Sequence, residues 1–429
     1  MKDVDASVLA RLFARIDAME GELVALTQDL IRFETINPPG KDYEPCARYI
    51  GERLKTAGFS IEYVRAEGAP GDSAACPRVN VVARRAGVRP GPCVHFNGHI
   101  DVVEVGHGWT VDPFAGIVKD SRVYGRGACD MKGGIAAAMI ALEAIAREGI
   151  PYHGALELSG TADEESGGYG GVGHLAKNGY FSKDKVDHVI IPEPLNPDRV
   201  CLGHRGVWWA EIEMRGRIGH GSMPQLGVSA IRGMAAFLAK VEERLYPLLN
   251  QRVTAMPCVP EGSRRSTLNY NSLHGGQPEP GDDLPAPVVA DRCRLVIDRR
   301  FLAEERLADV KAEVSELLEE TTKLDPELGY AVRELMMFEP VLTDAADPLV
   351  KTLDHWVERL FGRPAAHVAS PGTYDQKHIF RNSTLRSCVA YGPGILDLAH
   401  QPDEWVGIED MTTSAKVMAA AALSLTGVG

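Results

Sequence analysis

Short apolar stretches of strand length alternate with helical segments through the first half of the chain. The stretches VNVVARR, CVHFNGHI, ALELSG and HVIIPEP are predicted strands, and the alanine-rich run GGIAAAMIALEAIAREG between them is a predicted helix. Apolar runs of this length are typical of strands that are buried on both faces of a sheet. The alternation therefore predicts an α/β fold with a mostly parallel sheet whose faces are covered by helices.

The pattern changes after about Gly203. Three segments then alternate apolar and polar residues as antiparallel strands do, and two segments have helical spacing. The predicted strands are VWWAEIEMRGR, STLNYNSLHGG and CRLVIDRRF, and the predicted helices cover residues 230–246 and 302–324. We predict an inserted α+β module at residues 206–334, within a larger α/β domain formed by residues 1–205 and 335–429.

The composition excludes several classes of protein. The formal net charge of −13 argues against binding to nucleic acid or to an anionic membrane surface. The eight cysteines include no CxxC pair, which argues against a zinc ribbon and suits a reducing compartment. The N-terminal segment lacks the apolar core of a signal peptide, so we expect a cytoplasmic protein. From the net charge and the lack of a membrane-spanning apolar stretch, we expect no nucleic-acid or membrane partner.

The stretch TADEESGG places Asp163, Glu164 and Glu165 side by side, directly after a predicted strand. Adjacent like charges repel one another, and no basic residue stands next to them in the sequence. A bound cation would offset this charge, which makes the stretch a candidate metal site.

Other residues that can bind metal ions also follow predicted strands. His99 and Asp101 lie two apart, so both point to the same side of a strand. Asp130 lies in a glycine-rich turn, Glu193 ends a strand, and His400 lies far down the chain in LAHQPDEW. Sites in open α/β sheets form where strand ends meet the following loops, so we expect these residues to converge. Such a set suits a centre of two metal ions with one bridging carboxylate.

Each of these residues also has a simpler structural interpretation. A single histidine is more often a loop or core residue, and an acidic pair after a strand is usually a solvated turn or the start of a helix. Asp130 on its own could be a helix N-cap, and Glu193 could belong to a plain turn. Their joint occurrence at strand ends favours the metal site.

The chain resembles the di-zinc metallopeptidases that include aminoacylases, acetylornithine deacetylases, succinyl-diaminopimelate desuccinylases and glutamate carboxypeptidases. GHIDVVEVG, GRGACDMKGG, TADEESGG and the Glu-Pro step at residues 193–194 resemble four motifs of this family, in family order. GHGSMP and AHQPDEW resemble the segments of its lid histidine and its last metal ligand. The resemblance spans nearly the whole chain and implies a zinc-peptidase-like catalytic domain with an inserted lid that forms a homodimer.

The resemblance also implies a role for each matched residue. Asp101 would orient His99, Glu164 would be the general base, and His220 would reach the partner subunit's active site to stabilise an oxyanion. A cis peptide bond is implied between Asp130, which would bridge the two ions, and Met131. The implied metal ligands are His99, Asp130, Glu165, Glu193 and His400. The implied substrate-binding residues are Asn269, Arg300, Gly372 and Tyr374, the last standing where the family often has serine.

These residues predict metal-dependent hydrolysis of a C–N bond in a small substrate that carries a carboxylate. An N-acyl amino acid is the leading substrate, and two divalent ions per chain are expected, zinc first and manganese or cobalt as alternatives. A water between the ions would lose its proton to Glu164.

Three other functions compete with this hypothesis. Removal of an amine from an aromatic amino acid could use the same site. The aromatic residues Tyr374, Trp208 and Trp209 are consistent with this alternative. A non-catalytic binding protein on this fold would be expected to lack a ligand or Glu164, whereas every position is filled. The segment GGYGGVGH superficially resembles a dinucleotide-binding turn but lacks the spacing of that motif.

Overall fold

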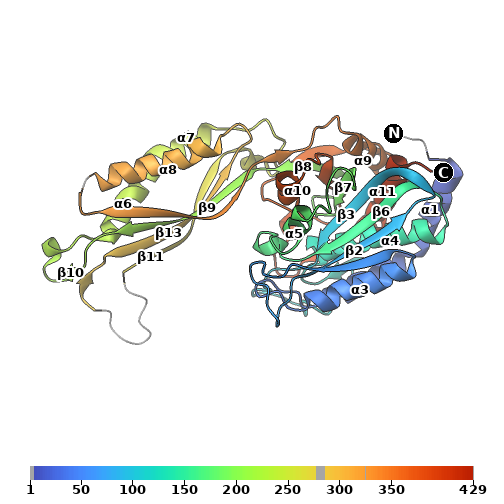
Figure 1. Cartoon of the computed structure of the whole chain (residues 1–429), viewed down its shortest axis with the longest axis horizontal. Helices are drawn as coiled ribbons and strands as arrows, with labels where there is room; N and C mark the ends of the chain where they lie inside the picture. Colours follow the sequence, from blue (N-terminus) through green and yellow to red (C-terminus); the bar gives the residue numbers. More distant parts are fainter. Residues whose placement is uncertain (1–3, 277–285, 324, 429) are drawn as a thin grey trace. The chain divides into compact units, whose positions relative to one another are not determined.

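The computed structural model describes residues 4–276, 286–323 and 325–428. The chain divides into two compact units, shown in Figure 1. The larger unit comprises Met1–Gly203, Leu342–Val368 and Tyr374–Gly429, and the inserted unit comprises His204–Val341 and Ala369–Thr373. Each unit has its own sheet and its own helices.

A nine-stranded sheet forms the centre of the larger unit. Its strands are β1 (Ser60–Arg65), β2 (Val79–Ala86), β3 (Arg89–His99), β6 (His153–Thr161), β7 (His188–Ile191), β8 (Arg199–His204), β15 (Val341–Leu342), β16 (Ala366–Ser370) and β17 (Cys388–Ala390). They lie in the order β1-β2-β6-β3-β7-β17-β8-β15, with β16 beside β8. The central strands β6, β3, β7 and β17 run parallel, as the apolar runs predict, while β1, β2 and β8 pair antiparallel to their neighbours.

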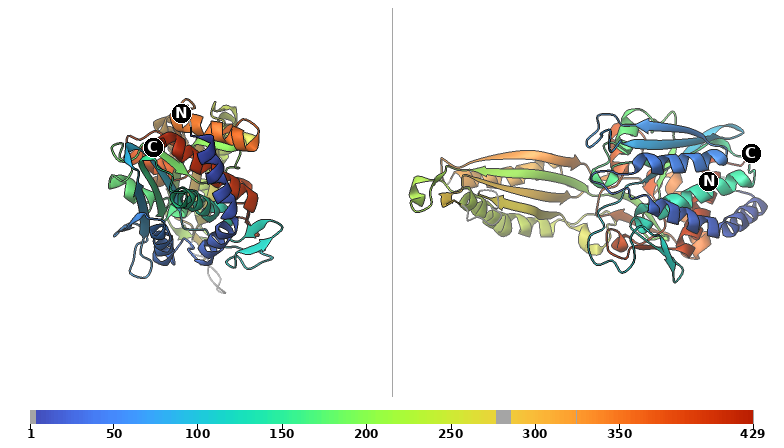
Figure 2. Two further views of the ribbon diagram at one scale, coloured as in Figure 1. Left: turned by 90° about the vertical axis from the view of Figure 1, so that its right-hand side faces the viewer. Right: turned by 90° about the horizontal axis from the view of Figure 1, so that it is seen from below.

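Helices cover both faces of this sheet (Figures 1 and 2). They are α1 (Ala6–Ala18), α2 (Glu20–Arg32), α3 (Tyr43–Thr56), α4 (Gly133–Arg147), α5 (Val172–Lys177), α9 (Pro348–Phe361), α10 (Gln376–Asn382) and α11 (Ile408–Thr426). On one face α4 and α11 pack against β3 and β6. A Cβ at Gly98 would meet Ile135 of α4 at 2.5 Å, so glycine lets this helix lie close to the sheet. On the other face Asn97 donates a hydrogen bond to Asp375, just before α10.

The inserted unit is an antiparallel sheet with helices on one face (Figure 2). Its elements are β9 (Gly206–Arg215), β10 (Gly219–His220), α6 (Ala230–Lys240), α7 (Tyr246–Gln251), β11 (Thr267–Gly275), β12 (Val288–Val289), β13 (Arg292–Phe301), α8 (Leu307–Thr322) and β14 (Gly329–Phe338). Four strands lie in the order β11-β13-β9-β14, and β10 pairs with β12. The strand β14 runs to Phe338, past the boundary at Glu334 that the sequence suggests.

No helix within the described ranges combines the length and the apolar character that a membrane crossing needs. Among the helices of the described residues, α11 is the longest, with 19 residues, most of which are buried within the larger unit. Its alanine-rich surface packs against α4.

Candidate functional site

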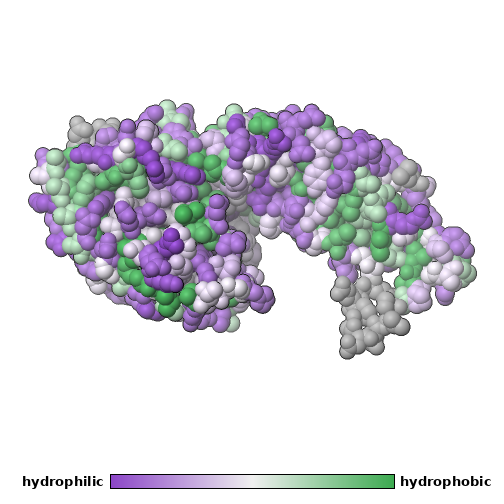
Figure 3. Space-filling view, turned by 180° about the vertical axis from the view of Figure 1, so that it is seen from behind, coloured by the Kyte–Doolittle hydropathy of each residue, from purple (hydrophilic) through white to green (hydrophobic). Residues whose placement is uncertain are grey.

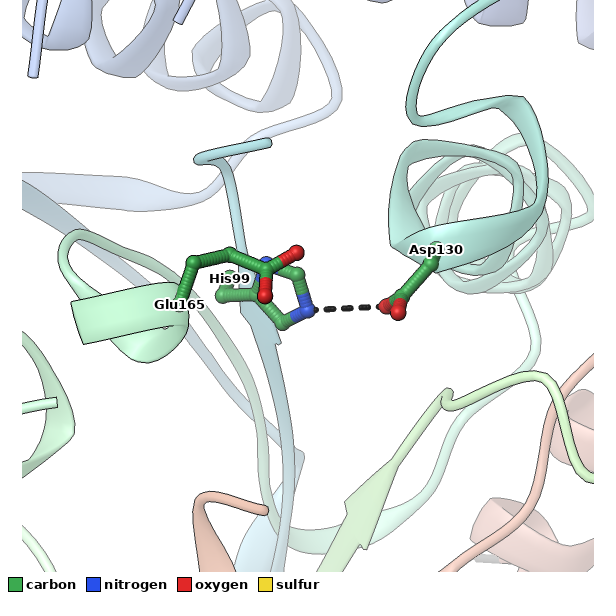
Figure 4. Close-up of side chains that lie close together, drawn as sticks. All are labelled: His99, Asp130 and Glu165. Atoms are coloured by element: carbon green, nitrogen blue, oxygen red, sulfur yellow. Dashed lines mark hydrogen bonds and ion pairs between the residues drawn. The ribbon is translucent and has the colours of Figure 1, made fainter. Parts of the chain in front are cut away.

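The carboxyl ends of the central strands bring the candidate ligands together. His99 is the last residue of β3, Asp130 lies in the turn Ala128–Lys132 before α4, and Glu165 lies in the turn Glu164–Ser166 after β6. Their side chains point toward one another (Figure 4). The ligand atoms of these three residues all lie within 4.8 Å of one another.

Asp130 lies between two histidines. Its Oδ1 is 3.0 Å from Nε2 of His99, and its Oδ2 is 3.4 Å from Nε2 of His400. Nε2 of His400 is also 3.1 Å from Oε1 of Glu165, and Nε2 of His99 is 3.8 Å from Oε1 of Glu193. The five side chains therefore form one cluster in which each histidine faces Asp130 and one further carboxylate.

The cluster contains more carboxylates than its two histidines can neutralise, and the shifted pKa values reflect this excess of negative charge. Burial raises the pKa of Glu165 to about 7. Burial and the neighbouring Asp130 raise the pKa of Glu193 well above its usual range. The hydrogen bonds that His400 donates to Asp130 and Glu165 raise its pKa to about 10. Without further positive charge, the cluster retains protons that isolated side chains would release near neutral pH.

Asp101 fixes the loop that carries the acidic stretch. Its carboxylate accepts hydrogen bonds from the backbone N–H groups of Glu164 at 3.1 Å and Glu165 at 3.0 Å, and from the side chain of Asn37 at 2.9 Å. Nδ1 of His99 lies 3.1 Å from the backbone carbonyl of Asp101 and 3.6 Å from its carboxylate. In this structure the main chain of Asp101 holds the imidazole, and its carboxylate holds the Glu164–Glu165 turn.

Two residues of the acidic stretch have basic partners from distant parts of the chain. Arg78 pairs with Asp163 at 3.1 Å, and both side chains are buried. The ammonium of Lys377, on α10, contacts Glu164 and is also buried. The absence of basic neighbours in the sequence was therefore misleading, because the fold supplies two of them. Glu165 faces His400 instead.

A comparison with protein families identifies the chain. Residues 95–424 match the model of peptidase family M20/M25/M40. The chain belongs to this family. A succinyl-diaminopimelate desuccinylase of Methylobacterium sp. (strain 4-46) is 30% identical over 409 residues, which cover 92% of this chain and 93% of the relative. An acetylornithine deacetylase of Myxococcus xanthus is 28% identical over 388 residues, covering 89% and 92% of the two chains.

The fold of this M20 chain agrees with a solved structure. Human carnosine dipeptidase 1 has a TM-score of 0.76 and 17% sequence identity, and the alignment covers 99% of this chain and 100% of that one. The predicted fold class and the predicted hydrolase of C–N bonds are confirmed by these comparisons. The peptide bond between Asp130 and Met131 is cis, as the resemblance implies.

The donor set of the M20 site fits divalent transition metals. Imidazole nitrogens and carboxylate oxygens are the ligands that zinc, manganese and cobalt accept. The raised pKa values of Glu165 and Glu193 indicate negative charge that two divalent ions would neutralise. The side-chain cluster therefore has both the atoms and the charge that such ions require.

In the described part of the inserted unit, the side chains of the candidate residues form hydrogen bonds with near neighbours in the sequence. His220 is exposed, and its Nδ1 accepts a hydrogen bond from the backbone N–H of Ser222 at 3.1 Å. Asn269, also exposed, donates to Asn271 at 2.8 Å. Arg300 pairs with Asp298 at 2.7 and 3.1 Å, two residues along the same strand.

Arg300 and Asn269 lie near one another on the sheet of the inserted unit. In the register of β11 and β13, Asn269 is opposite Asp298 and Thr267 is opposite Arg300. The guanidinium of Arg300 lies 6.0 Å from the ring centre of Trp209 on β9. Trp208, by contrast, belongs to the apolar core of the unit.

The segment after β16 holds its two candidates differently. The backbone N–H of Gly372 donates to Oγ of Ser370 at 3.2 Å. Tyr374 is only 4% exposed, and its hydroxyl donates toward Sγ of Cys201, 3.8 Å away. The phenol of Tyr374 therefore packs inside the larger unit, next to Cys201 of β8.

Proposed function

We propose that this M20 hydrolase removes an acyl group from a small N-acyl amino acid in a reaction that depends on two divalent metal ions. The observation that carries the proposal is the position of Asp130, with one carboxylate oxygen toward His99 and the other toward His400. A carboxylate that faces two imidazoles in this way suits a bridging ligand between two ions.

His99, Asp130 and Glu193 would hold one ion, and Asp130, Glu165 and His400 the other. Zinc is the metal we propose, with manganese or cobalt as alternatives for the same donors. When bound, such ions lower the pKa of a coordinated water and offset negative charge that develops on the substrate.

Glu164 is the proposed general base. It neighbours Glu165 but lies outside the cluster of ligand atoms, where its carboxylate contacts Lys377 instead. It would accept a proton from the attacking water and return it to the leaving nitrogen. The turn that carries it is held by the hydrogen bonds from its backbone to Asp101, and Lys377 holds its side chain in one orientation.

The inserted unit is proposed to be a lid through which two chains dimerise. Figure 3 shows apolar residues gathered on part of its surface, a feature that is common at protein interfaces. Among the described residues of this unit, the large apolar side chains that are exposed are Ile218, Met223, Leu226, Ile231, Leu248, Val253, Leu273, Val332 and Leu335. In the dimer, the exposed His220 would serve the partner subunit's site and donate a hydrogen bond to the oxyanion.

The substrate would carry a carboxylate bound by the inserted unit. Arg300 and Asn269 are the proposed contacts, because the guanidinium offers a planar pair of donors that match a carboxylate. Nε and Nη2 of Arg300 donate to Asp298, which holds the guanidinium in place on the strand, so the substrate carboxylate would meet its opposite side, which carries Nη1. Gly372 and Tyr374 remain proposed neighbours of the substrate. The names of the two curated relatives, a desuccinylase and a deacetylase, favour N-succinyl and N-acetyl amino acids as substrates.

A second candidate is removal of an amine from an aromatic amino acid. The half-buried Trp209 favours it, because its ring lies beside the proposed carboxylate-binding Arg300 and could contact an aromatic group. The two reactions differ in their products, since one releases a carboxylic acid and the other releases ammonia.

A cytoplasmic location is the remaining part of the proposal. All eight cysteines are free, and all but Cys76 are buried. Free cysteines in this number suit a reducing compartment.

A substrate screen tests the proposed function. Metal-loaded protein is incubated with N-acetyl and N-succinyl amino acids, dipeptides and aromatic amino acids, and released carboxylic acid and ammonia are both measured. We expect carboxylic acid from at least one N-acyl amino acid, and release at least roughly 10²-fold slower with the Glu164→Gln variant. Release of ammonia alone would favour the aromatic amine. No product from any substrate with two ions bound would favour a binding protein.

A further inference from the structure

A buried carboxylate lies beside the proposed metal centre without facing it. Glu404 precedes β18 (Trp405–Gly407) and is 1% exposed. Its Oε1 accepts hydrogen bonds from the backbone N–H groups of Cys129 at 2.8 Å and Asp130 at 3.0 Å. A buried carboxylate is costly unless each oxygen has a partner, so these contacts are not incidental.

The other carboxylate oxygen of Glu404 accepts a hydrogen bond from Arg126. This guanidinium is 1% exposed and lies 2.6 Å from Oε2 of Glu404. Hydrogen bonds to charged groups are stronger than neutral ones, and this pair is shielded from water. Both oxygens of Glu404 are therefore engaged by the protein, and the residue is not free to serve as a metal ligand.

Arg126 connects this pair to two further segments. It donates to the backbone carbonyls of Glu104 and Val105, both at 3.2 Å, in the segment that follows His99. It also donates to the carbonyl of His400 at 3.3 Å and of Gln401 at 3.4 Å. One buried ion pair thus touches the segments that carry three of the five proposed ligands.

His400 depends on such support more than the other proposed ligands do. Its side chain is 48% exposed, whereas that of His99 is 2% exposed, so little packing holds its imidazole. Its backbone is in the left-handed region with φ of 64°, which is uncommon outside glycine. The hydrogen bond from Arg126 to its carbonyl is a direct restraint on where this backbone lies.

We propose that Arg126 and Glu404 are positioning residues that set the separation of Asp130 and His400, and so the affinity of the metal centre. Glu404 holds the backbone N–H of Asp130, Arg126 holds the carbonyl of His400, and the pair joins the two. The inference rests on the proposed metal-dependent function and adds two residues that would not touch the ions.

The substitution Glu404→Gln tests this with metal affinity. The amide keeps the size of the side chain, but its one oxygen cannot serve both the two backbone N–H groups and Arg126. We expect at least one of the two zinc-binding steps to weaken roughly 10- to 100-fold, the usual effect of losing a partner that orients a ligand. Competition with a chromogenic zinc chelator measures this without any substrate.

Glu143→Gln is the matched control. Glu143 is 2% exposed and pairs with Arg53 at 2.6 Å, but it lies near the far end of α4, roughly 15 Å along the helix from the end that follows Asp130. Its variant should bind zinc as the native chain does. Equal losses in both variants, or native affinity in Glu404→Gln, would overturn the inference. A native chain that binds no zinc would overturn the proposed function as well.

Two more variants separate positioning from the cost of an unpaired buried charge. Arg126→Lys keeps a positive charge beside Glu404 but loses the planar set of donors to the carbonyls, and it should also weaken zinc binding. The double variant Arg126→Gln with Glu404→Gln leaves no unpaired charge, so its thermal stability should recover relative to Glu404→Gln while its affinity does not. Native zinc affinity in either variant would show that the pair only balances charge.

Discussion

The two units of the chain hold their candidate site residues in different ways. In the larger unit, His99, Asp130 and Glu165 face one another, and hydrogen bonds from other segments fix the turns that carry them. In the described part of the inserted unit, the side chains of His220 and Arg300 form hydrogen bonds with residues two positions away in sequence.

This difference distinguishes residues that the fold of one chain holds in place from residues that would act on a substrate or on a second subunit. In the larger unit, the buried carboxylates of Glu404 and Asp101 accept hydrogen bonds from the turns that carry the cluster. Such support is typical of a site that needs fixed geometry. The exposed residues of the inserted unit would find their partners in a substrate or in a second subunit. The following experiments test whether the two groups of residues act in these two ways.

The largest effect is expected for Glu164, which lies in the larger unit. Glu164→Gln should lower kcat by roughly 10²- to 10⁴-fold, because general acid–base catalysis contributes about that much. Zinc content should stay at the native level, because Glu164 contacts Lys377 and not the cluster. Activity and bound metal are measured on the same samples, with Glu143→Gln as control. Native activity, or loss of zinc, would exclude Glu164 as the base.

His220 tests the other side of the comparison. His220→Ala should lower kcat by roughly 10²- to 10³-fold, as loss of an oxyanion donor does, with unchanged zinc content. Ser222→Ala is a suitable control, because it removes the hydroxyl that lies 2.8 Å from Nδ1 of His220 and keeps the backbone N–H that donates to the same nitrogen.

Mixed dimers decide which chain His220 serves. Heterodimers of His220→Ala with Glu164→Gln should regain activity, because one of their two sites then has both a base and a histidine. Subunit exchange is followed independently by mass spectrometry of the mixed species. If exchanged dimers stay inactive, His220 acts within its own chain or has no catalytic role.

Arg300 should have a smaller effect, and on binding. Arg300→Lys loses the planar pair of donors, so KM should rise about tenfold while kcat changes little. Arg294→Lys is the matched control on the same strand, because Arg294 pairs with Glu213 at 2.9 Å. Equal KM values in Arg300→Lys and the native enzyme would remove Arg300 from substrate binding.

The smallest signal is the release of protons when metal binds. The hydrogen bonds that His400 donates to Asp130 and Glu165 raise its pKa to about 10, so the metal-free chain keeps this imidazole protonated at pH 8. Because an imidazole must lose its extra proton before it can bind a metal ion, binding should release at least about one proton per chain, and affinity should rise with pH up to about 10. Calorimetry in buffers of different ionisation enthalpy measures this. Binding without proton release would contradict the raised pKa.

Residues at the ends of strands were the part of the site that the sequence could predict. His99 and Glu165 follow the apolar strands β3 and β6, which run parallel and end at one edge of the sheet, and Asp130 is marked by the glycine-rich turn before the alanine-rich helix. The amphipathic pattern of residues 6–33 likewise predicts α1 and α2, which are separated only at Met19.

Partners that lie far apart in the sequence could not be predicted. Arg78 is 85 residues from Asp163, and Lys377 is 213 residues from Glu164. No local pattern marks either pair, because each is created only when the strands pack. Glu404 was visible within AHQPDEW, but nothing in that segment shows that its carboxylate would bind the turn of Asp130.

Metal content of the native chain and of Asp130→Ala tests the central claim most directly. If Asp130 bridges two ions, the native protein should hold about two zinc ions per chain and the variant should lose both together. Mass spectrometry of the metals in dialysed samples gives both counts, with Glu143→Gln again as control. A variant that keeps one ion at native affinity would make Asp130 a terminal ligand, and a native chain without zinc, manganese or cobalt would contradict the metal centre itself.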